Sequence, residues 1–312
     1  MQKLEATLTH ILSQLVYRWI PLPKTCSVWS ELHPFDLSFA DWQDFIDQQR
    51  DRWRRTSMEP SPWLRYLEQH FQAYQSVLVR EIIHHLAKLR NLRASYLTYY
   101  CQEYPDDLRQ IPDPPAALSL LGSTSLLTQP KLAIIGARRA SQRALIEARK
   151  LGKILSQEGG VIVSGGAIGC DRSAHQGCLD SGITPVPTIA VMAGGLQQLY
   201  PRYNHSLFME MKHRQGLFIS ERLCEARPRP YDFPVRNRII AGLSQRIIVM
   251  EAAAKSGALV TANLGLHFGR DVVILEPDQD DIRAEGSRML EQDGAPSFRS
   301  AADYWNLNWM QD

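Results

Sequence analysis

Six short apolar runs recur along the last two thirds of this 312-residue chain, and the segments between them are long enough to form helices. Inside each run, no polar residue alternates with the apolar ones. Continuous runs of this length are typical of parallel strands that are covered on both faces. The pattern therefore predicts an α/β fold with a doubly wound, mostly parallel sheet. The runs are Leu132–Ile135, Val161–Val163, Thr188–Met192, Leu217–Ile219, Arg246–Met250 and Val272–Leu275.

The overall composition is that of an ordinary globular protein. Hydrophobic residues make up 44% of the chain and charged residues 22%, which is enough apolar material for sizeable cores. The formal net charge is only +2, so binding to nucleic acid would have to depend on local clusters of basic residues. Five scattered cysteines without a Cys-x-x-Cys pair argue against a disulfide framework and a zinc site, and indicate a reduced, cytoplasmic setting. No stretch of about 20 apolar residues occurs, so no membrane span is expected.

The first hundred residues differ in character from the rest. Five of the seven tryptophans lie between Trp19 and Trp63, and apolar residues from Trp63 to Ile82 recur at steps of three and four, which is typical of a helix. We interpret these aromatic residues as core, with a nucleic-acid stacking surface as the alternative. The chain is expected to contain a small helical domain over residues 1–103, a proline-rich connector that packs onto the next domain over 104–130, and the α/β domain over 131–312.

Small residues follow several of the apolar runs. The carboxyl ends of parallel strands share one edge of a sheet, where glycines and helix N-termini let backbone N–H groups approach a phosphate closely. A serine and a glycine open a further helix at the same edge. The sequence therefore predicts a phosphate-binding crevice there. Its expected members are Gly136, Ser164, Gly165, Gly166, Gly169, Gly194, Gly195, Ser256 and Gly257.

The turn after the first run carries arginines in place of further glycines. It reads Gly136-Ala137-Arg138-Arg139, and neither a Gly-x-Gly-x-x-Gly turn nor a phosphate-binding P-loop motif occurs in the chain. A dinucleotide cofactor and a P-loop triphosphatase are thereby disfavoured, and no cofactor is expected. The guanidinium groups of Arg138 and Arg139 could instead fork onto phosphate oxygens.

A second basic segment leads into an apolar helix. Pro234 suits the first turn of a helix, and Arg236-Asn237-Arg238 follows directly. The two arginines point about 200° apart on a helix, so an extended polyanion suits them better than a single phosphate. Upstream, Arg227 and Arg229 alternate with prolines and add two more guanidinium groups.

Asp171 and His175 lie one helical turn apart after the second run. We interpret Asp171 as the cap of the helix that carries His175. An acid–base pair of these two residues is the alternative, although the sequence identifies no third member.

These segments together resemble the DprA/Smf family of DNA-processing proteins, over about Tyr104 to Trp305. The similar motifs are Ile135-Gly136-Ala137-Arg138, Ser164-Gly165 through Gly169 with Asp171 and Ala174-His175, Ala193-Gly194-Gly195-Leu196 with Tyr200-Pro201, Phe233-Pro234 through Ser244, and Glu251 with Ser256-Gly257 and Thr261-Ala262. The arginine segment is the most specific of these motifs.

The resemblance implies an extended Rossmann-like fold whose pocket binds the phosphates of single-stranded DNA. It also implies a non-catalytic protein that protects this DNA and loads the recombinase RecA in recombination or natural transformation, acts as a homodimer and uses no metal. No winged-helix domain is expected after the α/β domain. The residues implied to bind DNA are those of the crevice together with Arg138, Arg139, Asp171, His175, Gln176, Arg236, Asn237 and Arg238.

Three positions depart from the family pattern. Ala137 replaces a frequent serine, Ile168 replaces a common arginine, and Gln176 replaces a frequent lysine or arginine. Two expected positive charges are therefore missing, which predicts weaker binding or a changed ligand.

Two other functions remain open. A phosphoribohydrolase-like enzyme would use a Pro-Gly-Gly-x-Gly-Thr-x-x-Glu turn, which is absent, although Glu221 and Glu251 stand at strand ends where a carboxylate could polarise a ribose. A sensor module that binds a small nucleotide without turnover is the third possibility.

Overall fold

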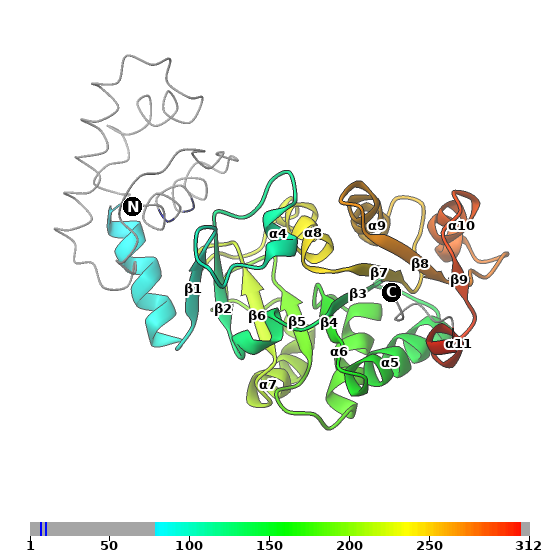
Figure 1. Cartoon of the computed structure of the whole chain (residues 1–312), viewed down its shortest axis with the longest axis horizontal. Helices are drawn as coiled ribbons and strands as arrows, with labels where there is room; N and C mark the ends of the chain where they lie inside the picture. The colour runs from blue at the N-terminus through cyan, green and yellow to red at the C-terminus, as the bar shows by residue number, and fades with distance from the viewer. Residues whose placement is uncertain (1–6, 8–9, 11–78, 307–312) are drawn as a thin grey trace, which may run out of the picture.

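A computed structural model describes residues 7, 10 and 79–306, and its centre is one nine-stranded sheet (Figure 1). The strands lie in the order β1-β2-β6-β5-β4-β3-β7-β8-β9. All six predicted runs form strands, β3 to β8, and these pair in parallel, so the predicted fold class is confirmed. The strands are β1 (Ser95–Thr98), β2 (Ala117–Leu121), β3 (Lys131–Ile135), β4 (Val161–Ser164), β5 (Thr188–Val191), β6 (Leu217–Ser220), β7 (Arg246–Val249), β8 (Asp271–Leu275) and β9 (Ser297–Phe298).

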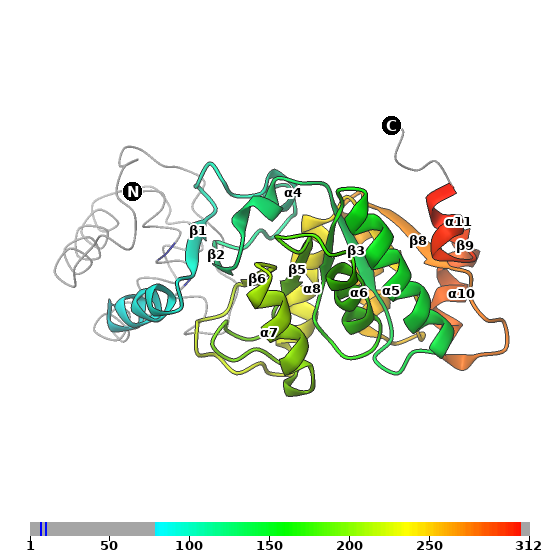
Figure 2. The same ribbon diagram turned by 90° about the horizontal axis from the view of Figure 1, so that it is seen from below.

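Helices cover both faces of the sheet (Figures 1 and 2). One face carries α5 (Gln142–Gln157), α6 (Cys170–Asp180), α7 (His205–His213) and α11 (Ala301–Asn306). The other carries α4 (Asp106–Arg109), α8 (Asp232–Leu243), α9 (Gly257–His267) and α10 (Glu285–Gln292). Short 3-10 helices join some of these elements: η2 (Thr124–Leu127), η3 (Arg202–Asn204) and η4 (Ile282–Ala284).

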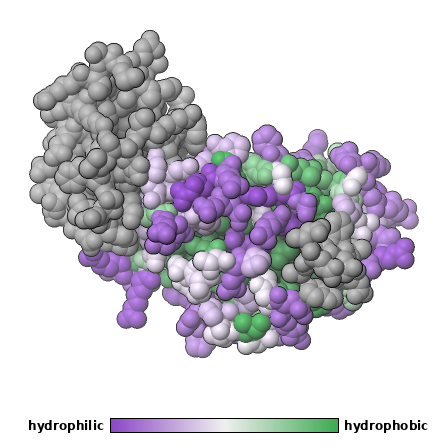
Figure 3. All heavy atoms as spheres, viewed as in Figure 1, coloured by the Kyte–Doolittle hydropathy of each residue, from purple (hydrophilic) through white to green (hydrophobic). Residues whose placement is uncertain are grey.

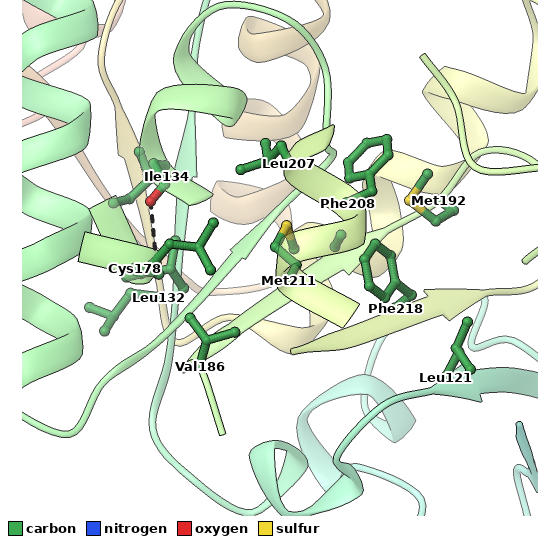
Figure 4. Close-up of a cluster of buried hydrophobic side chains, with 14 of the residues drawn as sticks. Leu121, Leu132, Ile134, Cys178, Val186, Met192, Leu207, Phe208, Met211 and Phe218 are labelled. Atoms are coloured by element: carbon green, nitrogen blue, oxygen red, sulfur yellow. Dashed lines mark hydrogen bonds between the residues drawn. The ribbon is translucent and has the colours of Figure 1, made fainter. Parts of the chain in front are cut away.

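Alternate residues of each central strand pack into two different cores. In β3, Leu132 and Ile134 belong to the cluster under α5 and α6, while Ala133 and Ile135 belong to the cluster under α8 and α9. This is why the runs are apolar at every position, since neither face meets water. Figure 4 shows the first cluster, in which Phe208 and Phe218 pack edge to face with ring centroids 5.9 Å apart.

The sheet changes its winding direction at β3. The chain proceeds from β3 outward through β4, β5 and β6, and then returns through α8 to place β7 on the other side of β3. The loops after β3 and β7 therefore leave the sheet on opposite faces. Such a topological switch point leaves a crevice at the carboxyl ends of the strands.

The sheet extends further toward the N-terminus than the apolar runs indicated. Residues 104–130, expected to form a connector, contain β2, which pairs antiparallel with β6, and β2 pairs in turn with β1. A serine interrupts the apolar residues of β2, and a pair of prolines precedes it, so its sequence resembles that of a loop.

Most of the predicted helical domain, including Trp19, Trp63 and the residues up to 78, lies outside the described residues. Residues 79–91 are helical. The boundaries at 103/104 and 130/131 stay predictions. In the described part of the chain, no helix has the length and apolar character that a membrane span needs. The face shown in Figure 3 carries mostly hydrophilic side chains, with apolar ones in small patches.

Candidate functional site

A cavity of about 590 Å³ opens at the switch point, at the carboxyl ends of β3 and β7. It is lined by the end of β3 and the loop after it, the loop after β4, Asp171 in the first turn of α6, Pro230 before α8, and residues of α8 and α9. Its volume and position are those of a ligand site in an open α/β sheet. The predicted site residues that line it are Gly136, Arg138, Asp171, Arg236, Asn237, Ser256 and Gly257.

Arg236 is a buried positive charge in the wall of the cavity. Its Nη1 donates hydrogen bonds to the carbonyl oxygens of Gly165, at 2.8 Å, and Val191, and its Nε donates to Oδ1 of Asn237 at 3.2 Å. Burial lowers the pKa of Arg236 to about 10, against the opposing effect of Asp171. The guanidinium therefore stays charged at neutral pH and is held rigidly by loops that follow two strands.

Asp171 organises the glycine loop after β4. Its Oδ2 accepts hydrogen bonds from the N–H groups of Gly165, at 3.0 Å, and Ala167, at 3.2 Å. The prediction that Asp171 caps α6 is wrong, because the N-cap is Gly169, whose φ of 84° suits glycine. The N–H groups that were expected to be open to a phosphate are thus bonded to an internal carboxylate. Burial raises the pKa of Asp171, and Arg236 opposes this rise.

Arg138 lies exposed at the mouth of the cavity. Its guanidinium stands over the ring of Phe233, 5.3 Å from the centroid, and the ring of Tyr200 contacts Phe233 at a centroid distance of 5.9 Å. The neighbouring Arg139 is exposed as well but does not line the cavity. The structure thus separates two adjacent arginines that were predicted to act together.

The loop that carries Arg138 is fixed at both ends. The N–H of Ala137 donates to the carbonyl oxygen of Glu251 at 2.8 Å, and the N–H of Ser141 donates to the Glu251 carboxylate at 3.0 and 3.2 Å. Gly169 packs so closely that a Cβ there would lie 2.3 Å from the carbonyl oxygen of Ala137. In the sequence, Glu251 stood out only as a family marker and a candidate catalytic carboxylate, whereas in the structure it anchors this loop.

The N-terminus of α9 forms the opposite rim. Ser256 is its N-cap, and its Oγ accepts a hydrogen bond from the N–H of Leu259 at 3.2 Å. Asn237 Nδ2 donates to the carbonyl oxygen of Gly257 at 3.2 Å and joins α9 to α8. The free N–H groups of the first helical turn carry partial positive charge, which favours an anion at this rim.

Arg238 does not reach the cavity. It is buried in ion pairs with Glu221, at 2.7 Å, and Asp113, at 2.9 Å. Because Arg236 and Arg238 point in different directions from α8, as expected, Arg238 reaches Glu221 and Asp113, and only Arg236 lines the cavity.

Three further predicted residues, Ser164, His175 and Gln176, make their contacts away from the cavity. Ser164 donates its hydroxyl to the carbonyl oxygen of Ile134 at 2.7 Å, and Gln176 donates to Asp180 at 3.4 Å on α6. His175 is completely buried beside Thr188, with Nδ1 2.7 Å from its hydroxyl oxygen, and burial with the nearby Arg236 lowers the pKa of His175 to about 3. Asp171 and His175 therefore bond to different partners and form no acid–base pair.

The remaining glycines let chain segments pack closely. Gly166 has a φ of 67° and lies against Phe208. A Cβ at Gly195 would lie 2.0 Å from the carbonyl oxygen of Leu223, and the N–H of Gly195 donates to the carbonyl oxygen of Ala226 at 2.8 Å. Gly194 similarly leaves room for Pro228. None of these three glycines lines the cavity.

The aromatic pair that supports Arg138 was not predicted to have a role. Tyr200 and Phe233 were noted only within family motifs. Their one common signal in the sequence is that each precedes a proline, which does not reveal that the two rings meet.

Known proteins resemble this chain over most of its described residues. The family model described as DNA recombination-mediator protein A matches residues 95–308. DNA processing protein DprA of Bacillus subtilis is 36% identical over 241 residues, which cover 74% of this chain and 80% of that protein. Protein Smf of Synechocystis is 39% identical over 204 residues, 64% of this chain but only half of that longer protein.

Two solved structures share the fold. The X-ray structure of DprA from Streptococcus pneumoniae has a TM-score of 0.70 and 30% identity, covering 98% of this chain and 95% of that one. The structure of DprA from Helicobacter pylori, which concerns the single-stranded DNA binding mode of that protein, has a TM-score of 0.62 and 30% identity. The match covers 69% of this chain and 94% of that one. Since the family model spans more than half of its residues, this chain belongs to the DNA recombination-mediator protein A family, the DprA/Smf family that its motifs resemble.

Proposed function

We propose that this chain binds single-stranded DNA in the switch-point cavity and acts as a non-catalytic mediator of recombination. The observation that carries the proposal is the placement of Arg236 and Arg138, one buried in the wall and one exposed at the mouth of the same open cavity. The H. pylori relative, which binds single-stranded DNA, and the match to a recombination-mediator family support the same function.

The cavity offers two kinds of contact to a phosphate. Arg138 presents an exposed guanidinium, which can fork onto two phosphate oxygens. The first turn of α9 presents N–H groups at the opposite rim. Arg236, held in the wall by bonds of Nη1 and Nε, adds the delocalised charge of its guanidinium to the cavity.

The cavity mouth also suits an unpaired base. Tyr200 is 48% exposed and lies edge-on to Phe233. An exposed ring beside a guanidinium can stack on the face of a base, which a single strand presents and a duplex does not.

Within this function, handing the DNA to RecA, homodimerisation, a cytoplasmic location and a part in natural transformation are further steps of the same proposal, and they rest on family membership. The missing charges at Ile168 and Gln176 place more of the binding on Arg138 and Arg236.

The enzyme alternative finds less support, because both candidate carboxylates have structural partners. Glu251 holds the loop of Arg138, and Glu221 pairs with Arg238. Neither lines the cavity. If the protein released free base from nucleoside monophosphates and Glu251→Gln abolished this release, the enzyme alternative would be favoured over DNA binding. A nucleotide sensor is the third candidate, because the cavity volume suits a nucleotide. Nucleotide binding that an oligonucleotide does not displace would favour it.

The test compares two adjacent arginines. Binding of an oligothymidylate is measured across a salt series for the wild type, Arg138→Ala and Arg139→Ala. A variant that makes one fewer ionic interaction with the phosphates should have a log–log salt slope shallower by about 0.7 for a single strand. We expect this change in Arg138→Ala alone, because Arg139 does not line the cavity. Equal binding by all three proteins would refute the assignment of the cavity.

A further inference from the structure

Residues 222–231, here called the strap, form a wall shared by two cavities. The strap's end at Pro230 lines the switch-point cavity. The strap's earlier part, from Arg222 to Arg229, lines a second cavity of about 290 Å³, whose other wall includes His84 and His85 of the helix at residues 79–91. A ligand that leaves the first cavity over the strap therefore reaches the second.

The strap is held firmly in place. The N–H of Cys224 donates to Nδ1 of His85 at 3.1 Å, and the carbonyl oxygen of Ala226 accepts from Gly195 at 2.8 Å. The N–H of Arg229 donates to Oδ2 of Asp232, at the start of α8, at 2.7 Å. Side chains on the strap are thus presented from a fixed backbone, which lowers the entropy cost of binding.

The strap carries the chemistry of a nucleic-acid surface. Tyr231 is 47% exposed, and the Arg229 guanidinium lies 5.9 Å from its ring centroid and donates to its hydroxyl at 2.7 Å. Arg227 is exposed, and within the described part of the chain no carboxylate pairs with it. Aromatic faces beside guanidinium groups are what single-stranded nucleic acid binds without regard to sequence.

The acidic residues of the second cavity do not cancel this charge. Glu225 is paired with Lys88 at 2.9 Å and with His84 at 2.5 Å. Glu81 also lines the cavity, together with three arginines of the strap. One of these, Arg222, is paired with Asp232 at 3.5 Å. Among the described residues, Arg227 therefore remains an exposed positive charge of this surface without a carboxylate partner.

We propose that bound single-stranded DNA continues from the switch-point cavity across the strap, with a base stacked on Tyr231 and a phosphate at Arg227, and reaches the second cavity. This inference rests on the proposed function, since it extends the path of the same strand. It predicts that the strap matters only for strands long enough to leave the first cavity.

The experiment compares oligothymidylates of about 5 and about 20 nucleotides, which bracket common single-strand site sizes. For the longer strand, Tyr231→Ala should weaken binding about 5-fold or more without changing the salt slope, because stacking releases no counterions. Arg227→Ala should make that slope shallower by about 0.7. Neither variant should alter binding of the shorter strand. Tyr231→Phe keeps the ring and should bind the longer strand like the wild type.

The controls separate this inference from the proposed function. Lys153→Ala and Lys212→Ala remove exposed positive charges from α5 and α7, away from both cavities, and should leave both strands unaffected. Arg138→Ala should weaken both lengths. If it does so while the strap variants bind the longer strand like the wild type, the strap subsite is refuted and the cavity stands. If Tyr231→Ala weakens both lengths equally, the strap belongs to the first cavity and the extension is refuted. If the wild type binds neither strand, both proposals fail.

Discussion

Asp171 and Arg236 both bind the backbone of Gly165. Oδ2 of Asp171 accepts a hydrogen bond from the N–H of Gly165 at 3.0 Å, and Nη1 of Arg236 donates one to the carbonyl oxygen of Gly165 at 2.8 Å. The two side chains have opposite charges, and each favours the charged form of the other. Because both are buried and hydrogen-bonded, removing one would leave an uncompensated charge in the fold. The glycine loop after β4 therefore positions Arg236 in the cavity wall. The N–H groups of this loop bind Asp171, which helps to hold the loop in place, and are not used to bind a ligand.

Gly165→Ala adds only one methyl group, yet it should disturb the cavity markedly. A Cβ at this position would lie 2.6 Å from Nη2 of Arg236 and 2.9 Å from Oδ2 of Asp171, so one of them must move. We expect a loss of about 1–3 kcal/mol in the free energy of unfolding, typical of overpacking, together with weaker DNA binding. Urea unfolding and fluorescence anisotropy measure the two effects.

Gly257→Ala is the matched control at the rim of the same cavity. Its nearest neighbour would be Nδ2 of Asn237 at 3.9 Å, an ordinary contact. Its free energy of unfolding should equal or slightly exceed that of the wild type, because alanine favours a helix. Equal stability losses in the two variants would contradict this account of Gly165.

The central strands could be predicted because each is buried on both faces, which leaves a continuous apolar run in the sequence. The edge formed by their carboxyl ends followed from the same reasoning, and it led to Gly136 and Arg138. Arg236 was found instead from the basic segment that leads into α8. β2 was missed since Ser119 interrupts its apolar residues. Its place in the sheet depends on pairing with β6, about 100 residues later in the chain, which no local pattern reveals.

The roles of individual site residues were harder to predict, because they depend on partners far away in sequence. Arg238 looks like Arg236 in the sequence, yet Asp113 and Glu221 neutralise it. Asp171 stands where a helix cap would be expected, but the positive φ of Gly169 moves the start of the helix and frees the carboxylate for the loop. Neither the ion pairs of Arg238 nor the hydrogen bonds of Asp171 can be predicted from the spacing of residues along the chain.

Arg238→Ala should act on stability and leave DNA binding by the folded protein nearly unchanged. The substitution leaves Glu221, which is 17% exposed, without its buried partner, and costs about 3 kcal/mol in the free energy of unfolding. Arg138→Ala should show the reverse, since Arg138 is exposed and has no carboxylate partner within the described residues. Chemical unfolding with parallel binding measurements distinguishes the two arginines, and a binding defect in stably folded Arg238→Ala would contradict the prediction.

His175 should make the fold sensitive to acid. Burial lowers its pKa from 6.5 to about 3, so the unfolded chain binds a proton that the folded protein excludes. The stabilisation is therefore complete above pH 6.5 and declines as the pH falls toward 3, by about 2 kcal/mol between pH 8 and about pH 5. His10 and His85, whose pKa values burial also lowers, act in the same direction. The measurement is the difference in this decline between the wild type and His175→Gln, and identical declines would refute the role of His175.

Phe233 should contribute to DNA binding through Arg138. The guanidinium stands 5.3 Å from the ring centroid at an exposed site, where such a contact is worth about 0.5–1 kcal/mol. Phe233→Ala should weaken binding because it frees Arg138 to rotate, and Phe233→Tyr should preserve binding because it keeps the ring.

A double-mutant cycle isolates the contact between Phe233 and Arg138. In an Arg138→Ala background, the cost of Phe233→Ala in binding free energy should fall by about 0.5–1 kcal/mol. The same cycle with Arg139→Ala is the control and should be additive, since Arg139 does not line the cavity. Additivity in both cycles would show that the ring acts on the strand independently of the guanidinium.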